Sequence, residues 1–217
     1  MALKQISIGN ETQMNALQFP LWKRSFDVFI SSLGLLILTP FFLLIAAIIK
    51  LDSSGPVFFR QERIGYGFDK FRIFKFRTMV ADAPKKGILL TAHNDDRITK
   101  VGRILRKVKI DELPQLINVL LGEMTLVGPR PEVEKYVRLF TPDYREILRI
   151  RPGITDIASL KYRNESEVLR LAADPEEEYI TRVLPDKIAL AKEYVRRSSL
   201  FFDISLILKT AAKTVAG

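Results

Sequence analysis

The chain has 217 residues, of which 34 are Lys or Arg and 25 are Asp or Glu, so its formal net charge is +9. With 47% hydrophobic and 27% charged residues, it is neither disordered nor collagen-like, and a domain of this length can bury a sizeable core. The absence of Cys excludes disulfide scaffolds, thiol nucleophiles and cysteine-ligated metal sites, and the single His, His93, excludes a His-rich metal site. A pI near 9.7 indicates a polyanionic partner: nucleic acid, anionic lipid or a phosphorylated substrate.

The N-terminal part of the chain predicts a membrane-inserted segment. Residues 1–22 are mixed in character and predict a loosely held arm, whereas residues 26–49 carry no charge apart from Asp27. A helix of that length reaches across a bilayer core of about 30 Å. No small-residue cleavage site follows it, so it is not a signal peptide. We therefore predict a membrane-inserted segment at 23–52 and a water-exposed domain at 53–217.

Pro40 divides this apolar segment directly after Thr39. Proline removes a backbone hydrogen bond and clashes with the preceding turn, so it kinks or breaks a helix. Two topologies follow: a kinked helix that spans the membrane, or a re-entrant hairpin whose ends both lie on the cytoplasmic side. Composition favours the kinked span. The positive residues on both flanks, Lys23 and Arg24 before the segment and Lys50 after it, favour the hairpin.

The remaining chain predicts a helix-rich α/β domain. Two runs of aromatic and β-branched residues, separated by Gly65 and Gly67, predict a pair of strands, with FRIFKFR at 71–77 as the clearer one. Loop-like sequence then precedes a basic helix whose apolar stripe is Val101, Ile104, Leu105 and Val108. In chain order, we expect a loop at 81–96, helices at 97–108 and 111–121, a GPRPE turn at 128–132, helices at 134–140 and 144–150, an RPGIT turn at 151–155, a helix at 184–197, and a terminal helix at 200–213 that is packed or interfacial.

Asp111 and Glu112 form an adjacent acid pair behind the basic helix. Asp is a favoured N-cap, and Glu and Pro114 suit a first helical turn, so local structure alone explains the pair. The functional alternative is that the preceding cations keep a carboxylate ionised, so that it acts as a nucleophile or a metal ligand. Without further evidence, the structural explanation is the stronger one.

Two turns each present an arginine, Arg130 in GPRPE and Arg151 in RPGIT. The prolines on either side of Arg130 fix the backbone, so its guanidinium is aimed in advance for bidentate phosphate binding. Gly153, after Arg151, permits close backbone approach of a ligand. Each turn is also explained as a simple turn with an exposed arginine.

The order of these motifs resembles that of the bacterial sugar transferases, the small monotopic phosphoglycosyl transferases of glycoconjugate assembly. The resemblance covers nearly the whole chain. It is carried by KRSFD at 23–27, GPVFFRQERIG at 55–65, FKFRTM at 74–79, the continuous run at 97–132, and RPGIT at 151–155. Members often continue this last element with Gly-Trp, where this chain has Asp-Ile.

The resemblance implies a reaction and a set of residues. Members move a sugar phosphate from a UDP-sugar to polyprenol (undecaprenyl) phosphate, release UMP through a covalent Asp–phosphosugar intermediate, and initiate exopolysaccharide or lipopolysaccharide assembly. The family's catalytic pair falls on Asp111 and Glu112, the latter for proton handling or cation positioning. Its phosphate-binding arginines fall on Arg106, Arg130 and Arg151.

The resemblance also implies a cofactor, partners and a location. Mg²⁺ suits an oxygen-only site with few protein ligands, and Asp111 is the expected ligand. The expected partners are a UDP-sugar, polyprenol phosphate and membrane lipids, with a homodimer left open. The expected fold is a helix-rich α/β chain with a re-entrant membrane helix hairpin and a small catalytic domain with amphipathic interfacial helices, on the cytoplasmic face of the bacterial inner membrane. The other residues implied are Pro129, Pro131, Glu132 and Gly153 near the nucleotide, and Thr39 and Pro40 at the membrane break.

Two rival functions come from other classes. A membrane-tethered nucleic-acid or anion-binding module would use the basic and aromatic run KFRIFKFR as a stacking platform. The acid pair argues against it, because it repels phosphate unless a cation intervenes. A structural anchor for a glycan-assembly complex would need none of the four motif residues, Arg106, Asp111, Glu112 and Arg130, which are all present.

Overall fold

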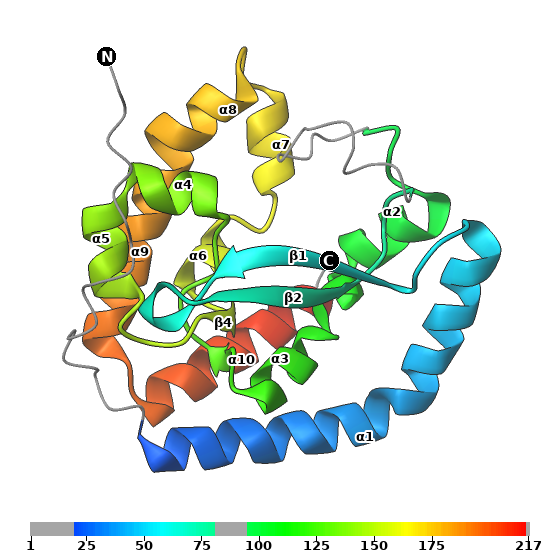
Figure 1. Cartoon of the computed structure of the whole chain (residues 1–217), viewed down its shortest axis with the longest axis horizontal. Coiled ribbons are helices and arrows are strands. Elements are labelled where there is room, and N and C mark those ends of the chain that lie inside the picture. The colour runs from blue at the N-terminus through cyan, green and yellow to red at the C-terminus, as the bar shows by residue number, and fades with distance from the viewer. Residues whose placement is uncertain (1–19, 81–94, 216–217) are drawn as a thin grey trace.

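The computed structural model describes residues 20–80 and 95–215 (Figure 1). The predicted N-terminal arm and the loop predicted at 81–96, which includes His93, lie mostly outside these residues. The helices are α1 (Leu21–Asp52), α2 (Lys100–Lys107), α3 (Gln115–Leu121), α4 (Glu134–Leu139), α5 (Thr141–Ile147), α6 (Ile157–Lys161), α7 (Glu165–Arg170), α8 (Pro175–Glu178), α9 (Leu184–Arg197) and α10 (Leu200–Val215). The strands are β1 (Phe58–Ile64), β2 (Lys70–Phe76), β3 (Thr125–Val127) and β4 (Gly153–Thr155). The predicted helix-rich α/β class is confirmed.

The predicted membrane segment is one continuous helix, α1, of 32 residues. It is long and apolar enough to cross a membrane. Pro40 lies inside it, and the Thr39 hydroxyl donates a hydrogen bond to the Leu35 carbonyl at 2.6 Å. Proline and this kind of threonine bond both bend helices, and Figure 1 shows α1 running along the domain and then turning upward. The re-entrant prediction expected two helices separated by a break, whereas the structure has one continuous helix that bends.

Buried polar contacts hold the first turns of α1 on the domain. Lys23 is buried, donates to the Val127 carbonyl and the Tyr194 hydroxyl, each at 3.0 Å, and forms an ion pair with Asp203 of α10. Arg24 donates to carbonyls at the end of α3, including that of Leu120 at 2.9 Å. Both positive residues of the first flank thus bind the domain rather than solvent.

The other end of α1 is also tied to the domain. Arg77, just after β2, donates to the carbonyls of Ile49, Ser53 and Ser54 at 3.3, 2.6 and 2.8 Å. Ile49 itself is buried in an apolar cluster with Phe76 of β2. The two ends of α1 are therefore anchored on the same folded unit.

The described part of the domain contains two small two-stranded sheets. β1 and β2 pair antiparallel from Phe58 opposite Phe76 to Ile64 opposite Lys70, which confirms the predicted strand pair. β3 and β4 pair in parallel, with Thr125 opposite Gly153. The prediction of a turn at 151–155 is wrong, because residues 153–155 form β4. The pairing partner β3 lies far away in the sequence, and no local pattern indicates it.

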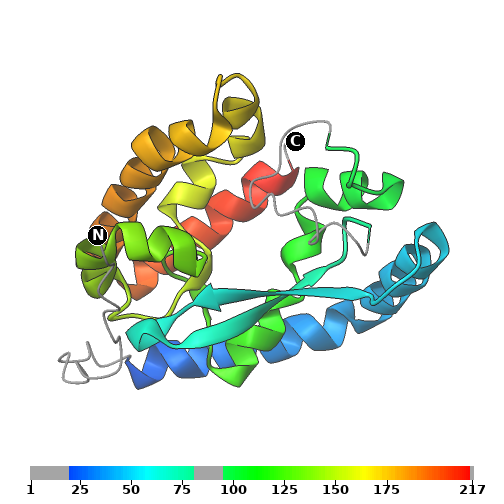
Figure 2. The same cartoon turned by 45° about the horizontal axis from the view of Figure 1, so that its top comes forward.

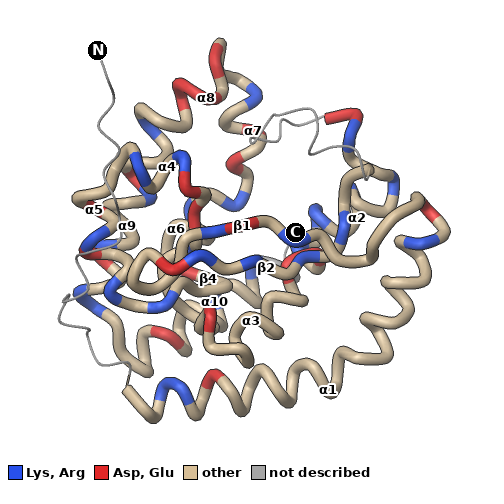
Figure 3. Tube along the Cα trace, in the orientation of Figure 1, with Lys and Arg blue, Asp and Glu red and all other residues tan. Residues whose placement is uncertain are grey.

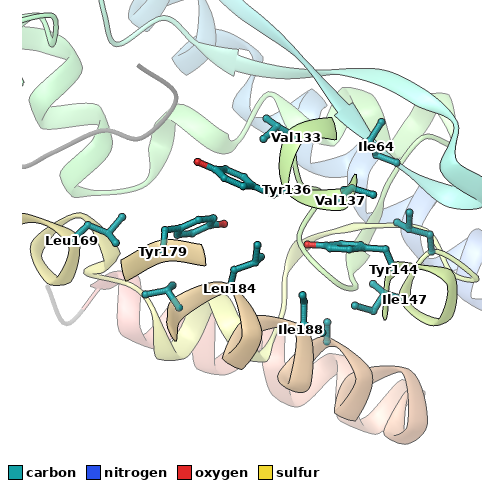
Figure 4. Close-up of a cluster of buried hydrophobic side chains, with 13 residues drawn as sticks. Ile64, Val133, Tyr136, Val137, Tyr144, Ile147, Leu169, Tyr179, Leu184 and Ile188 are labelled. Carbon is teal, nitrogen blue, oxygen red and sulfur yellow. The ribbon is translucent and has the colours of Figure 1, made fainter. Parts of the chain in front are cut away.

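The apolar core falls into three clusters, and the largest lies under the C-terminal helices (Figure 4). Its tyrosines Tyr136 and Tyr179 lie together, with ring centroids 4.9 Å apart. The cluster consists of Ile64, Val133, Tyr136, Val137, Tyr144, Ile147, Leu148, Leu169, Tyr179, Val183, Leu184, Ile188 and Ala191. It joins β1 to α4, α5 and α9, so the C-terminal helices share a core with the strands.

Other predicted elements need small corrections. The basic helix begins at Lys100, because the Thr99 side chain caps it by accepting a bond from the Gly102 amide. Ile104, predicted on its apolar stripe, is 66% exposed, whereas Leu105 is buried. The predicted helix at 184–197 matches α9. The terminal helix α10 packs through Leu206 and leaves other apolar side chains exposed.

We predict that Gly153→Ala destabilises the fold. A Cβ there would lie 2.0 Å from the Gly128 amide nitrogen, so β4 and the GPRPE turn would have to separate. We expect a loss of about 3 kcal/mol in the free energy of unfolding, measured by urea unfolding of the detergent-solubilised protein. Gly67→Ala is the control: Gly67 has φ +61° but open space around it, so only about 1–2 kcal/mol of strain is expected. Equal losses in the two variants would contradict the close approach.

Candidate active site

A cleft of about 1610 Å³ lies beside the acid pair, and its walls come from β1, β2, α2, the GPRPE turn and the C-terminal helices. Figure 2 shows how the ribbons of these elements are arranged. Arg106, Asp111, Glu112 and Arg130 all line it, so residues far apart in the sequence meet in one site. Pro129, Pro131 and Glu132 line it too. The site is thus open to a ligand and bordered by several cationic side chains.

Asp111 and Glu112 lie on a short 3₁₀ turn, Ile110–Glu112, and α3 begins only at Gln115. The predicted helix at 111–121 therefore starts late, and Asp111 is not its cap. Lys109, at φ 57°, turns the chain between α2 and this 3₁₀ turn. Asp111 is 7% exposed, and its Oδ1 is buried without a hydrogen-bond partner in the described part of the chain.

Glu112 is held by two cations from other elements. Arg130 donates through both terminal nitrogens, with Nη1 2.9 Å from Oε2 and Nη2 bonded to Oε1. The Lys75 ammonium of β2 donates to Oε1 at 2.8 Å. This bidentate arrangement is the strong form of a carboxylate–guanidinium pair. Glu112 therefore links the 3₁₀ turn, the GPRPE turn and β2.

The two neighbouring carboxyls have opposite pKa shifts. Burial and the adjacent charge of Glu112 raise the pKa of Asp111, against the opposing charges of Lys75 and Arg106. Burial alone would also raise the pKa of Glu112, but Arg130 and Lys75 hold it well below its usual range. Glu112 thus stays ionised, which favours a positioning role over proton handling, whereas the charge on Asp111 depends on what binds beside it.

Arg106 and Arg130 are each fixed by further contacts. The Arg106 Nε donates to the Thr78 hydroxyl at 2.8 Å. The Arg130 backbone amide donates to Asp156 Oδ2 at 3.2 Å, and Asp156 Oδ1 caps α6 by accepting the Ser159 amide at 2.6 Å. Asp156 is the first of the two residues at which this chain departs from the Gly-Trp that members often carry, and here it ties the RPGIT segment to the backbone of Arg130.

The remaining residues predicted to contact the substrate lie farther from the acid pair or outside the cleft lining. Glu132 accepts bonds from Arg63 at 3.0 Å and from the Tyr179 hydroxyl at 2.6 Å, so it supports the cleft wall. Arg151 lies outside the cleft lining with its guanidinium 5.9 Å from the centre of the Tyr66 ring, and Gly153 packs on the GPRPE turn. Their predicted substrate contacts stay predictions.

Lys75 is a residue of the site that was not predicted from the sequence. In the strand pattern it falls at the same parity as the buried residues Phe71 and Ile73. A charged residue at an apolar strand position is a signal of a buried partner. That signal indicates that Lys75 is paired, although it does not identify Glu112 as the partner.

The site offers a hard cation such as Mg²⁺ one free carboxylate oxygen. No group of three or more Asp, Glu or His side chains gathers within the described residues, so a cage made only of protein ligands is absent there. Asp111 offers an unpartnered carboxylate oxygen, whereas the oxygens of Glu112 are already bonded. Mg²⁺ commonly binds one or two carboxylates and completes its shell with water and substrate phosphates, which matches this donor set.

We predict that Glu112→Gln lowers stability at neutral pH, because Lys75 and Arg130 lose their counter-charge. We expect a loss of about 2 kcal/mol, less than for a fully buried pair, since Arg130 is partly exposed. A carboxyl with a depressed pKa stabilises the fold above its unfolded pKa of about 4.3, and that stabilisation is lost as the pH falls. The gap in melting temperature between wild type and variant should therefore close toward pH 3. A gap independent of pH would argue against the ion pair.

Proteins with similar sequences include an exopolysaccharide production protein and two sugar-phosphate transferases. The chain is 38% identical over 203 residues to the exopolysaccharide production protein ExoY of Rhizobium meliloti, covering 87% of this chain and 83% of that protein. It is 36% identical over 218 residues to the UDP-glucose:undecaprenyl-phosphate glucose-1-phosphate transferase of Caulobacter vibrioides, covering 94% and 77%. It is 38% identical over 200 residues to the UDP-N-acetylgalactosamine-undecaprenyl-phosphate N-acetylgalactosaminephosphotransferase of Aeromonas hydrophila, covering 90% of this chain but 44% of that protein.

The family comparison covers the domain and the membrane helix together. The model described as "Bacterial sugar transferase" matches residues 18–217, a range that includes α1, the acid pair and the C-terminal helices. The family predicted from the motifs is thereby confirmed, and the chain belongs to the bacterial sugar transferase family.

Proposed function

We propose that this protein is a phosphoglycosyl transferase that moves a sugar-1-phosphate from a UDP-sugar to polyprenol phosphate and releases UMP. The observation that carries the proposal is Asp111, a buried carboxylate with an unpartnered oxygen, in a cleft lined by Arg106 and Arg130. Relatives named as undecaprenyl-phosphate sugar phosphotransferases support the same reaction class.

In the first half-reaction, a carboxylate oxygen of Asp111 attacks the phosphorus that bears the sugar. A bond forms between that oxygen and phosphorus, and the bond from phosphorus to the UMP oxygen breaks, so the electron pair leaves on UMP. The enzyme then carries an acyl-phosphate sugar. Arg106 and Arg130 neutralise the diphosphate oxygens, which otherwise repel the attacking carboxylate.

In the second half-reaction, a phosphate oxygen of polyprenol phosphate attacks the same phosphorus. The bond to Asp111 breaks, and its electron pair restores the carboxylate, so the product is a polyprenol diphosphate sugar. Mg²⁺ bound at Asp111 would supply positive charge beside the diphosphate. Glu112 positions Arg130 and Lys75 throughout, because its low pKa keeps it ionised.

We further propose that α1 is re-entrant, with both ends on the cytoplasmic side. A straight 32-residue helix is about 48 Å long, so a spanning α1 would place one end across the membrane from the domain. The contacts of Lys23 and Arg77 hold both ends on one unit, which supports the hairpin. Apart from Lys50, the large exposed side chains of α1 are apolar, as expected for immersion in lipid: Leu21, Trp22, Phe29, Leu33, Leu36, Ile37, Phe41, Leu43, Leu44, Ile48 and Leu51.

The anion-binding alternative has weaker support. Among the basic residues of β2, Lys70 pairs with Glu62 and Glu134, and Lys75 pairs with Glu112. Cations that are already paired offer little to a nucleic-acid backbone. Arg77 donates to carbonyls at the end of α1, so three of the four cations at 70–77 are engaged, and among the described residues only the Arg72 side chain of this run has no hydrogen-bond or ion-pair partner.

We predict that Asp111→Asn abolishes turnover while the protein stays folded. The amide cannot form the acyl phosphate, so intact-mass analysis after incubation with UDP-glucose or UDP-N-acetylgalactosamine should show a sugar-phosphate adduct on wild type only. Release of UMP should fall by at least 10³-fold, as expected for loss of a nucleophile. Near-unchanged melting temperature is the control for folding. Persistent turnover by Asp111→Asn would refute the covalent mechanism.

We predict that both flanks of α1 label from the cytoplasmic side. The chain has no native Cys, so single Cys residues at Asn10 and Ser54 report unambiguously on topology. A membrane-impermeant thiol reagent should reach both positions in inside-out vesicles and neither in intact spheroplasts. Labelling at position 10 in spheroplasts would establish a true span. Pro40→Leu, which straightens the helix, should increase that labelling.

A further inference from the structure

One end of the cleft differs in chemistry from the rest. We call the end beside α2 the α2 arm. Its walls are apolar or cationic: Pro56, Phe58, Phe59, Arg60, Met79, Val80, Arg103 and Lys107. The opposite end carries hydroxyl, amide and carboxylate groups: Tyr136, Tyr162, Asn164, Glu165, Ser166 and Tyr179. Its cations already have partners, since Lys187 pairs with Glu165, and Arg163 and Lys213 donate to backbone carbonyls. The acid pair and Arg130 lie on the wall that both ends share.

The cations of the α2 arm are placed to meet an anion. Arg103, Arg106 and Lys107 lie at i, i+3 and i+4, so they share one face of α2, and all three line the cleft. Figure 3 shows these basic residues gathered on α2. The Arg106 side chain donates a hydrogen bond to Thr78. The side chains of Arg103 and Lys107 are exposed and have no hydrogen-bond or ion-pair partner within residues 20–80 and 95–215.

The α2 arm also adjoins the membrane helix. Ile45 and Ile49 of α1 form one apolar cluster with Leu105 of α2 and Phe76 of β2, and Phe58 packs against it. Figures 1 and 2 both show α2 beside the upturned end of α1. This cluster is buried and fixes α2 against α1, while Ile48 of α1, Ile104 of α2 and Phe59 of β1 are exposed and offer apolar contacts to a chain that leaves the bilayer beside this end of α1.

We infer that the acceptor, polyprenol phosphate, enters through the α2 arm, with its phosphate on Arg103 and Lys107 and its first isoprene units against Phe59 and Met79. This inference rests on the proposed function and assigns one of its substrates to a subsite. Only the acceptor combines a phosphate with a long apolar chain, which is the combination that the arm offers. The hydrogen-bonding groups of the opposite end suit the sugar and the nucleotide.

The test separates the two half-reactions in the full-length protein. Wild type and an Arg103→Ala/Lys107→Ala double variant are reconstituted in phosphatidylcholine nanodiscs. Each is supplied with either UDP-glucose or UDP-N-acetylgalactosamine, whichever of the two gives a UMP burst with wild type. We expect the KM for undecaprenyl phosphate to rise at least tenfold in the double variant. The UMP burst without acceptor should stay within about twofold of wild type. Lys100→Ala, which removes an exposed lysine of the same helix outside the cleft lining, should change neither value.

Three outcomes would overturn the inference. A parallel loss of the burst would assign these cations to the nucleotide sugar, and an unchanged KM would leave them without a role in acceptor binding. A defect that appears only when anionic phospholipid is added would assign them to bulk lipid. Retention of undecaprenyl phosphate, measured by native mass spectrometry of the nanodiscs, checks the subsite without catalysis. Wild type should retain more than the double variant even if no UDP-sugar gives a burst, whereas equal retention would overturn the inference.

Discussion

The arrangement of the site depends on the ionised carboxylate of Glu112. A buried negative charge is costly unless cations compensate it, and here Arg130 and Lys75 do so from the GPRPE turn and from β2. Each cation would in turn be costly without Glu112. The three groups therefore fix one another, and with them the walls of the cleft on either side of Asp111. Removing Glu112 leaves two cations without their counter-charge, whereas removing either cation unties one element from the 3₁₀ turn.

This constraint separates the roles of two neighbouring acids. Glu112 takes the available cationic contacts, and its pKa falls, while Asp111 keeps an unpartnered oxygen and its pKa rises. Adjacent titratable groups whose environments push their pKa values apart are typical of active sites. In the proposed mechanism, the cationic charge that arrives with the substrate would stabilise the ionised form of Asp111, so substrate binding would also activate the nucleophile.

Local sequence patterns predicted the elements that need no distant partner. The alternation in FRIFKFR predicted β2, the helical period predicted α9, and Gly122 marked the end of α3 with φ 82°. The failures share one cause. β4 exists because β3 lies beside it, and the 3₁₀ turn at Asp111 is fixed by contacts of Glu112 with Arg130 and Lys75. The motif match predicted Arg106, Asp111, Glu112 and Arg130 as site residues, and the fold brings them together in one cleft, but the pairing of Arg130 with Glu112 rather than with solvent comes only from the fold.

For the apolar helix α1, the sequence and the fold give different grounds for the proposed topology. In the sequence, Lys23 and Arg24 count as flanking charges under the positive-inside rule. In the fold, Lys23 is buried against Asp203 and Tyr194, and Arg24 binds carbonyls at the end of α3, where a cation also complements the helix dipole. Both charges therefore bind α1 to the domain, and they are weak evidence for the orientation of α1 in the membrane. The stronger argument for the proposed hairpin is mechanical: both ends of α1 bind one domain, so a segment inserted into the membrane between them has to bend, and Pro40 lies where bending costs least.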